Sequence, residues 1–401
     1  MTGAASATRP HLARALSPAR LGPLTLRNRV IKTATYEGMT PRGLPSRALV
    51  EHHCELARGG VGMTTVAYCA VSPHGRTFAE QMYMREEAVV PLAALVEEVH
   101  AYGAAVSLQL GHCGYFSRNT ELPGRRSLGP SRLLNPYGLL SGIPFSREMT
   151  ARDIEEVACQ FADAAERAVR AGFDAVELHL GHGYLLSQFL SPATNLRRDQ
   201  YGGSIGNRLR VPLLVLERVR DAVGSRCAVI AKTNLRDGFR GGLEIDDAVE
   251  VCRALEAGGV DAIELTGGFT SRTPFYLFRG AAPLEEMIAA EKSRAQRLAL
   301  RFFGKSVVRE YPFEEMYFLD LARTVRAAVK VPLILLGGML SAGNLETAMR
   351  EGFDFVAMGR ALLADPDLIA RFEAGTAERS RCISCNKCVA ESDRAGVRCV
   401  L

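Results

Sequence analysis

Short apolar segments alternate with amphipathic segments along most of the chain. Eight apolar segments rich in Val, Ile and Leu have the length and composition of buried strands; they lie at residues 29–33, 61–66, 105–110, 175–179, 228–232, 262–265, 333–336 and 355–358. The segments between them place apolar residues at helical spacing, as residues 153–171 do before a Gly ends the pattern. The pattern predicts strands that alternate with helices, and therefore a parallel sheet.

This order of elements places the chain in the α/β class. Strands as apolar as these need a cover on both faces, which a closed (β/α)8 barrel, the TIM barrel, provides with its outer ring of helices. An open doubly wound sheet is the alternative fold. The count of eight and the absence of a G-x-G-x-x-G sequence after the first strand favour the barrel. We expect one barrel domain at residues 16–375, a flexible N-terminal lead at 1–15 and a short Cys-rich tail at 376–401.

Two predicted connections are long. Residues 113–149 follow the third strand, and residues 267–314 follow the sixth and include a helical pattern at 284–303. The C-terminal strand ends of such a barrel carry the active site, so both loops should overhang it. Long loops in a compact domain are typical of lids and functional insertions. Extra packed structure or an oligomer contact is the alternative interpretation.

The composition excludes several classes of protein. The 401 residues are 47% hydrophobic and 23% charged, which excludes a largely disordered chain. The formal net charge of +5 is mild for this length, and no dense run of Lys and Arg indicates a nucleic-acid groove. No apolar run is long enough to cross a membrane, and the N-terminus lacks the apolar core of a signal peptide. We therefore expect a cytoplasmic protein with a small-molecule substrate and no nucleic-acid or membrane partner. A monomer and a homo-oligomer are both consistent with the composition.

The ten cysteines fall into two groups. In the cytosol, thiols and metal ligands are more common than disulfides, and six of the ten lie among apolar neighbours where we expect the core. The other four, Cys382, Cys385, Cys388 and Cys399, form a C-x-x-C-x-x-C motif and a fourth cysteine after ten intervening residues. This spacing is typical of iron–sulfur ligands. Four thiolates can also bind zinc, and free thiols are the third interpretation.

Two histidines and a tyrosine follow the fourth predicted strand, in the sequence Glu-Leu-His179-Leu-Gly-His182-Gly-Tyr184. Neutral imidazoles at a strand end can donate hydrogen bonds to a carbonyl oxygen that gains negative charge. A nearby phenol can give a proton to the adjacent carbon. Structural histidines are the alternative, and a metal site is a weaker one because no carboxylate has zincin-like spacing.

Several motifs, in order along the chain, resemble the old yellow enzyme superfamily of FMN oxidoreductases. They are Leu-Arg-Asn-Arg-Val-Ile at 26–31, Ala-Arg-Gly-Gly-Val-Gly at 57–62, Leu-Gln-Leu-Gly-His-Cys-Gly at 108–114, the His/Tyr motif, residues 195–208, Leu-Gly-Gly-Met at 336–339 and residues 357–366. The resemblance runs from Leu16 to the C-terminus. It implies an FMN that lies across the barrel mouth and NAD(P)H as the co-substrate.

The resemblance assigns the phosphate of FMN to two turns. Gly337 and Gly338 follow the seventh predicted strand, and Gly359 and Arg360 follow the eighth. Glycine allows a close backbone approach to a phosphate, and an arginine adds charge-assisted hydrogen bonds. Without the second turn, a Gly-Gly pair is more often the start of a helix.

Two further polar residues are assigned to the pyrimidine end of the flavin by the same resemblance. Gln109 matches a glutamine whose amide can both donate and accept hydrogen bonds. Lys232 stands where many members carry Arg, and a cation there would stabilise negative charge on the reduced flavin. A snorkelling surface lysine and the Schiff-base lysine of an aldolase-type barrel are the alternatives for Lys232.

The first strand departs from the family pattern. Thr33, Ala34, Thr35 and Tyr36 replace the usual Pro-Met followed by Cys or Thr, so Thr35 or Tyr36 would lie near the flavin N5 atom. Tyr68 replaces a residue that is commonly small. Both changes indicate a narrower or more polar substrate pocket.

The tail resembles that of the 2,4-dienoyl-CoA reductase and trimethylamine dehydrogenase branch, in which a similar cysteine set binds a [4Fe-4S] cluster close to FMN. That branch continues into a second dinucleotide-binding half, whereas this chain ends two residues after Cys399. A cluster would then exchange electrons with a separate partner protein.

The resemblance implies an ene-reductase-like enzyme that transfers hydride from NAD(P)H through flavin to an electron-poor acceptor such as an α,β-unsaturated carbonyl. His179 and His182 would bind the acceptor, and Tyr184 would supply the proton. The alternative enzyme is a flavin/iron–sulfur dehydrogenase that passes electrons from an amine or a saturated substrate to a partner. A non-catalytic flavin-binding subunit is disfavoured, because it would not need these three residues.

Overall fold

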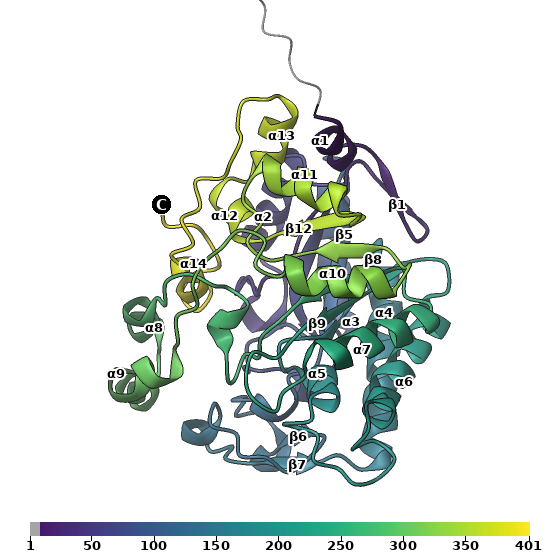
Figure 1. The fold of residues 1–401 in the computed structure, drawn as a ribbon. Coiled ribbons are helices and arrows are strands. Elements are labelled where there is room, and N and C mark those ends of the chain that lie inside the picture. Colours follow the sequence, from purple (N-terminus) through teal and green to yellow (C-terminus); the bar gives the residue numbers. More distant parts are fainter. Residues whose placement is uncertain (1–8) are drawn as a thin grey trace, which may run out of the picture.

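The computed structural model describes residues 9–401 and contains a closed barrel of eight parallel strands (Figure 1). The strands are β3 (Val30–Lys32), β4 (Met63–Ala70), β5 (Ala105–Gly111), β8 (Ala175–Leu180), β9 (Ala228–Asn234), β10 (Ala262–Thr266), β11 (Leu333–Leu335) and β12 (Phe355–Met358). β12 pairs with β3 and β9 pairs with β10, so the sheet has no open edge. Each predicted strand overlaps one of these eight, and the predicted (β/α)8 barrel is confirmed.

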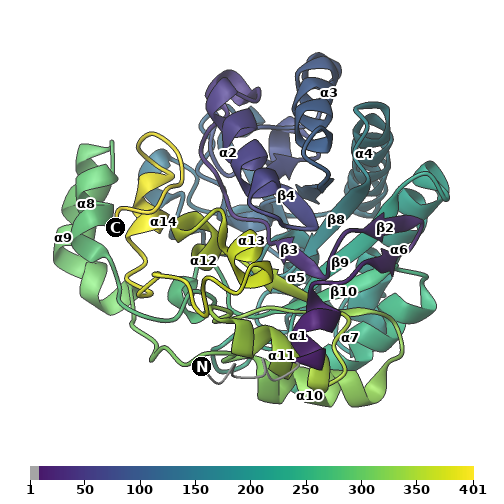
Figure 2. The same cartoon turned by 90° about the horizontal axis from the view of Figure 1, so that it is seen from above.

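Helices surround the barrel, as Figure 2 shows from above. They are α2 (Arg47–Arg58), α3 (Glu86–His100), α4 (Ala151–Arg170), α5 (Leu185–Leu190), α6 (Ile205–Val223), α7 (Ile245–Ala257), α10 (Leu319–Ala328), α11 (Ala342–Arg350), α12 (Arg360–Ala364) and α13 (Leu368–Glu373). Side chains cap the first turns of α2, α4, α6 and α11. The helix expected at 153–171 starts at a capping box, in which Thr150 and Asp153 accept each other's backbone N–H groups.

Apolar side chains fill two layers. A large core lies between the strands and the helices, and a smaller one fills the barrel interior around Ile31, Ile230 and Phe355. The hairpin of β1 (Ala19–Leu21) and β2 (Leu24–Leu26) contributes to the inner layer, where Leu21 and Leu26 are buried. The interior is therefore a packed core. A site for polar side chains is expected at the C-terminal ends of the strands.

Part of the segment expected to be a flexible lead is helical. Residues 10–15 form helix α1 (Pro10–Ala15), with a proline at its start and Leu12 and Ala15 buried. Arg9 forms ion pairs with Glu346 (2.9 Å) and Glu378 (2.8 Å). Residues 1–8 lie outside the described residues. Between residues 9 and 401, no helix has the length and hydropathy needed to cross a membrane.

The two long connections carry structure of their own. The first contains η3 (Gly114–Phe116), η4 (Pro123–Arg125), β6 (Ser127–Gly129), η5 (Leu139–Ser141) and β7 (Ser146–Glu148). The second contains η6 (Pro274–Tyr276), α8 (Leu284–Ala290) and α9 (Arg294–Val307), so the single helical stretch expected there is two helices. Arg118 of the first connection joins them, because its Nη1 bonds Glu291 (3.1 Å) and Gln296 (2.6 Å) of the second.

The C-terminal tail lies against the second connection. Helix α14 (Lys387–Glu391) is close to α8 in Figures 1 and 2, and Lys387 pairs with Glu286 of α8 at 2.7 Å. Five of the six scattered cysteines are buried as expected, whereas Cys159 is exposed on α4. The apolar neighbours of Cys159 in sequence were misleading, because they lie on other faces of the helix.

Candidate active site

A cavity of about 550 Å³, counted to its open mouth, lies at the C-terminal ends of the barrel strands. Its walls come from β3, β9, β11, β12 and the second long connection, which supplies Leu277 and Phe278. Nine of the predicted site residues line it: Thr33, Ala34, Thr35, His182, Lys232, Gly337, Gly338, Gly359 and Arg360. These residues are far apart in sequence, and the barrel brings them around one space.

Glycines shape one end of the cavity. Gly337 and Gly338 have φ angles of +111° and +70°, which side chains rarely tolerate. A Cβ on Gly338 would lie 2.8 Å from the backbone oxygen of Glu314, and one on Gly337 would lie 2.7 Å from the Phe318 ring. Only glycine fits at either position, and both glycines line the cavity, where their backbone can approach a phosphate.

Two buried polar atoms at this site have no hydrogen-bond partner in the described chain. They are Thr35 Oγ1 and His179 Nδ1. Buried polar atoms are nearly always paired, so these two indicate contacts with a ligand. Together with the glycine cradle and the cation of Lys232, they fit a flavin with a phosphate group.

The two histidines approach each other from β8 and the turn after it. Their ring centroids are 5.0 Å apart, and His182 Nε2 lies 2.8 Å from Thr266 Oγ1. Asn234 Oδ1 accepts the backbone N–H of His182, whose φ is +56°. Burial and the charge of Lys232 lower the pKa of His182 to about 3, and burial, His182 and Lys232 lower the pKa of His179. Both imidazoles are therefore neutral near pH 7.

Tyr184 stacks on His179, with ring centroids 4.4 Å apart. Burial raises the pKa of Tyr184, so the phenol keeps its proton at neutral pH. The ring centroids of Tyr68 and Tyr184 are 5.0 Å apart. The Tyr68 hydroxyl donates to the backbone oxygen of Gly75 at 2.9 Å. Tyr68 is inside β4 rather than after it, because this strand continues to Ala70.

Not every predicted residue reaches the cavity wall. Tyr36, Tyr68 and Tyr184 belong to one apolar cluster beside it, and the ring centroid of Tyr36 lies 5.9 Å from that of Phe78. Two more predicted site residues, His179 and Gln109, do not line the cavity. Gln109 points into the barrel and donates from Nε2 to Glu177 Oε1 at 2.7 Å. After β3 it is therefore Thr35, rather than Tyr36, that lines the cavity.

Lys232 is buried in a network of charges within the barrel. Its Nζ lies 2.8 Å from Glu264 Oε1 and 3.7 Å from Glu177 Oε1, and it donates to Thr33 Oγ1 at 2.7 Å. Thr33 in turn donates to Glu264. Burial opposes the charge of Lys232, but the two carboxylates outweigh it and raise its pKa. Burial also raises the pKa of Glu177, and Lys232 opposes that shift.

Sequence reasoning missed Glu264 and gave no role to Glu177. Both are acidic residues inside apolar strands, which was a usable signal, because a buried carboxylate needs a partner. Glu264 is the register partner of Lys232 in the β9–β10 pair. Glu177 lies on the same side of β8 as His179, two residues away.

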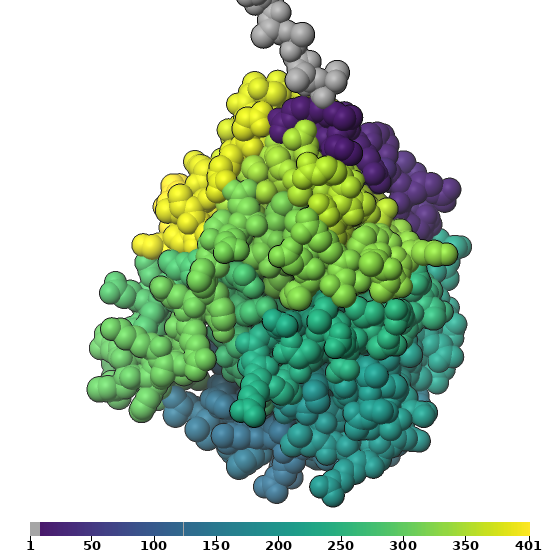
Figure 3. Space-filling view, in the orientation of Figure 1, coloured from purple at the N-terminus to yellow at the C-terminus, as the bar shows by residue number. Residues whose placement is uncertain are grey.

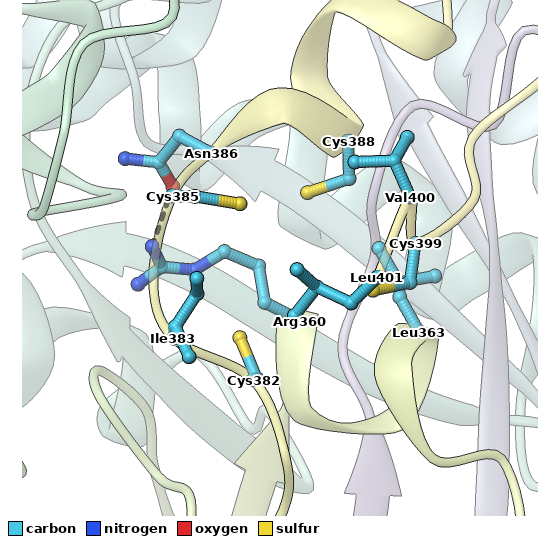
Figure 4. Close-up of a pocket in the computed structure, with 10 residues that line it drawn as sticks. All are labelled: Arg360, Leu363, Cys382, Ile383, Cys385, Asn386, Cys388, Cys399, Val400 and Leu401. Carbon is cyan, nitrogen blue, oxygen red and sulfur yellow. Dashed lines mark hydrogen bonds between the residues drawn. The ribbon is translucent and has the colours of Figure 1, made fainter.

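The four tail cysteines surround a second cavity of about 300 Å³ that includes space at its mouth. Figure 4 shows the sulfur atoms of Cys385 and Cys388 directed toward the same space, with Cys382 and Cys399 completing the wall. Burial raises the pKa of Cys388 to about 11, and Arg360 opposes this shift. In the range 9–401, no group of three or more His, Cys, Asp or Glu side chains is arranged to hold a metal ion.

Arg360 lines both cavities. Its Nη1 donates to the backbone oxygen of Arg279 at 2.9 Å and to Asn386 Oδ1 in the tail. One side chain therefore separates the space beside Gly359 from the space between the cysteines.

Residues 16–268 match the profile of the NADH:flavin oxidoreductase / NADH oxidase family. The chain belongs to this family. Membership supports FMN as the cofactor and NAD(P)H as the co-substrate of this oxidoreductase.

Two individual relatives match most of the chain. The 4,4'-dithiodibutanoate disulfide reductase of Rhodococcus erythropolis is 47% identical over 387 residues, which are 96% of this chain and 94% of that protein. The NADH oxidase of Thermoanaerobacter brockii is 32% identical over 381 residues, and the match spans 94% of this chain but 53% of that protein. The chain thus spans about half the length of that relative.

Solved structures agree on the barrel. Morphinone reductase in complex with tetrahydroNAD superposes with a TM-score of 0.70 at 26% identity, over 92% of this chain and 93% of that one. A 2-naphthoyl-CoA reductase complex gives a TM-score of 0.81 at 23% identity, over 96% of this chain and 56% of that one. The second likeness concerns the fold alone.

Proposed function

We propose that this NADH:flavin oxidoreductase reduces an electron-poor acceptor, an α,β-unsaturated carbonyl compound, whose carbonyl oxygen binds between His179 and His182. FMN, when bound, supplies the hydride transfer between NAD(P)H and the acceptor. The observation that carries the proposal is the pair of buried, neutral imidazoles whose rings lie 5.0 Å apart beside the cavity. Neutral donors fixed in a dry site stabilise an oxygen that gains negative charge.

Each remaining residue has one task in this proposal. Gly337, Gly338, Gly359 and Arg360 would hold the phosphate of FMN, and Thr35 Oγ1 would contact the flavin ring. Tyr184 would protonate the carbon next to the carbonyl, because its phenol remains protonated and stacks on His179.

Lys232 would face the pyrimidine end of the flavin. Its ammonium group is held by Thr33 and Glu264. Gln109 lies on the same side of the barrel and would bind the pyrimidine edge from its position beside Glu177.

The double variant His179→Ala with His182→Ala tests the acceptor site. We expect FMN to remain bound, since the glycine cradle and Lys232 are untouched. Reoxidation of the reduced enzyme by an enone should slow by about a hundredfold or more, as when an oxyanion donor is removed. His100→Ala, at the exposed end of α3, is the control. Reoxidation at the wild-type rate by the double variant would contradict the assigned roles.

A disulfide is the second candidate acceptor, and the 47% identical disulfide reductase of R. erythropolis favours it. A disulfide takes two electrons and two protons to give two thiols, so NAD(P)H would supply the electrons, and NAD(P)H and solvent the protons. Turnover of 4,4'-dithiodibutanoate and of an enone by the same preparation separates the two candidates. If the disulfide is turned over faster than the enone, the acceptor of this enzyme is a disulfide.

We also propose a [4Fe-4S] cluster in the tail, which would allow exchange with a separate electron-transfer partner. Support comes from Cys382, Cys385, Cys388 and Cys399 lining one cavity and from their C-x-x-C-x-x-C spacing, which is typical of iron–sulfur ligands. Such a cluster would also permit the alternative function, a dehydrogenase for an amine or a saturated substrate.

The cluster proposal is tested on anaerobically purified protein. Cys385→Ser should lose iron and the broad absorbance of a cluster but keep FMN. Cys159→Ser, on the surface of α4, should lose neither. Wild-type protein with FMN but without iron would overturn the cluster, and a zinc assay of the same sample would then separate a zinc site from free thiols.

A further inference from the structure

Helix α9 exposes apolar side chains that a surface helix normally turns inward. Within its fourteen residues only Gly304 is buried, where a Cβ would meet Leu284 of α8 at 2.5 Å. The exposed apolar residues, named here the α9 patch, are Leu298, Phe302, Phe303 and Val307, with exposures of 54%, 75%, 65% and 55%. The helix therefore contacts the protein through a narrow strip and leaves its apolar face open.

The segment that carries the patch is basic. Residues 292–309 contain no Asp or Glu and six cations: Lys292, Arg294, Arg297, Arg301, Lys305 and Arg309. Arg294, Arg301 and Lys305 are exposed, and no carboxylate of the described chain pairs with them. Spacings of seven and four residues put these three on one side of the helix, next to the patch.

The patch continues onto the first long connection. Gln296 of α9 donates to Ser141 Oγ at 3.2 Å, which places η5 beside the helix. Leu139 and Leu140 of η5 are 50% and 52% exposed. In Figure 3 the segment around α9 forms a lobe that projects from the molecule. A flat partner can reach this lobe without meeting the barrel first.

We propose that the α9 patch docks on the surface of an anionic phospholipid bilayer. Exposed Phe and Leu beside a row of unpaired cations are the features of a helix that lies in the membrane interface. Charge decides between this occupant and a second copy of the chain. A twofold contact through α9 would bring Arg294, Arg301 and Lys305 of both copies together.

The proposal is independent of the acceptor chosen by the active site. It replaces the expectation that the protein has no membrane partner with attachment to the membrane surface. The same long connection supplies Leu277 and Phe278 to the wall of the cavity, so the α9 patch and the cavity wall belong to one connection.

Co-sedimentation of the FMN-loaded protein with vesicles tests the docking. We expect binding to vesicles of phosphatidylcholine mixed with phosphatidylglycerol, and little binding to phosphatidylcholine alone. Phe302→Ser with Phe303→Ser should lower the partition coefficient by about a hundredfold or more, given the transfer free energy of two aromatic side chains. Val90→Ser, which removes a 77% exposed valine from α3, should leave binding unchanged.

A charge variant and a size measurement complete the test. Arg294→Glu, Arg301→Glu and Lys305→Glu together should abolish the preference for anionic vesicles. Equal binding by wild type and the Phe302/Phe303 variant would overturn the proposal, as would absence of binding to anionic vesicles. An oligomer in light scattering that this variant converts to a smaller species would also overturn it, because a second copy would then cover the patch.

Discussion

Lys232 is the centre of a buried network of charges with Glu264 and Glu177. Its ammonium group is 2.8 Å from Glu264 and 3.7 Å from Glu177, and all three side chains are almost completely buried. Such a group is stable only while the partners remain, because a single charge left in the interior is costly. The network therefore constrains stability as well as the electrostatics of the flavin end.

Lys232→Met should lower the free energy of unfolding of the apoprotein by about 3–5 kcal/mol, as the loss of one partner of a buried pair does. Lys232→Met combined with Glu264→Gln removes one of the two stranded carboxylates and should recover part of that loss. Denaturant unfolding of both variants measures the effect. Equal stability of the single and double variants would show that Glu264 is not the partner of Lys232.

The sequence placed Lys232 at the end of an apolar strand, but it did not predict the carboxylates that pair with it. Glu264 faces Lys232 only because β9 and β10 pair in one register, which tertiary packing sets. Gln109 and Tyr68 show the same limit. Their motifs were visible, whereas the direction of each side chain depended on how far β4 and β5 extend.

At the scale of elements, the turn after β11 has a backbone conformation that requires glycine. Gly338 has φ +70° and lies against the backbone of Glu314 and Met316. Gly343, five residues later in α11, has open space, with Ser341 Oγ at 3.8 Å as its nearest neighbour. Two glycines so close in sequence thus serve different purposes, and the difference can be measured.

Gly338→Ala should lower the free energy of unfolding by at least about 1–2 kcal/mol, the cost of a left-handed conformation with a Cβ. It should also weaken FMN binding, because the cradle must move. Gly343→Ala should leave FMN binding intact and raise stability by up to about 1 kcal/mol, since alanine is favoured inside a helix. FMN titration and thermal unfolding of the pair distinguish a cradle from an ordinary turn.

The elements themselves were predictable to different degrees. Apolar period and length identified all eight barrel strands, because each strand is buried on both faces and so carries an unbroken apolar signal. The second long connection was harder. Its helical pattern was read as one helix, and the break at Glu291–Ser293 became evident only with α8 and α9 in place. The exposure of the α9 patch could not be predicted, since apolar spacing in a sequence is equally consistent with a buried face.

At the scale of the whole molecule, the barrel and its loops bury several neutral histidines. His112 is fully buried, and its Nδ1 accepts the backbone N–H of Gly114 at 3.0 Å. Burial and the charge of His74 lower the pKa of His112 to about 3. The pKa of His182 is also about 3. Protonation of either ring inside the fold is therefore opposed until far below neutral pH.

The sign of the resulting pH dependence follows from linkage. Below about pH 6.5 an unfolded histidine binds a proton that buried His112 does not, so the unfolded state gains protons and stability falls as the pH falls. His112 alone should account for a loss of about 2 kcal/mol in the free energy of unfolding between pH 7 and pH 5. His112→Asn should reduce the decline by that amount, whatever its effect at pH 7. Urea unfolding at both pH values measures the difference, and equal m-values would show that the denatured state is unchanged. If the free energy of unfolding of His112→Asn declined as steeply as that of the wild-type protein, His112 would already titrate in the native state.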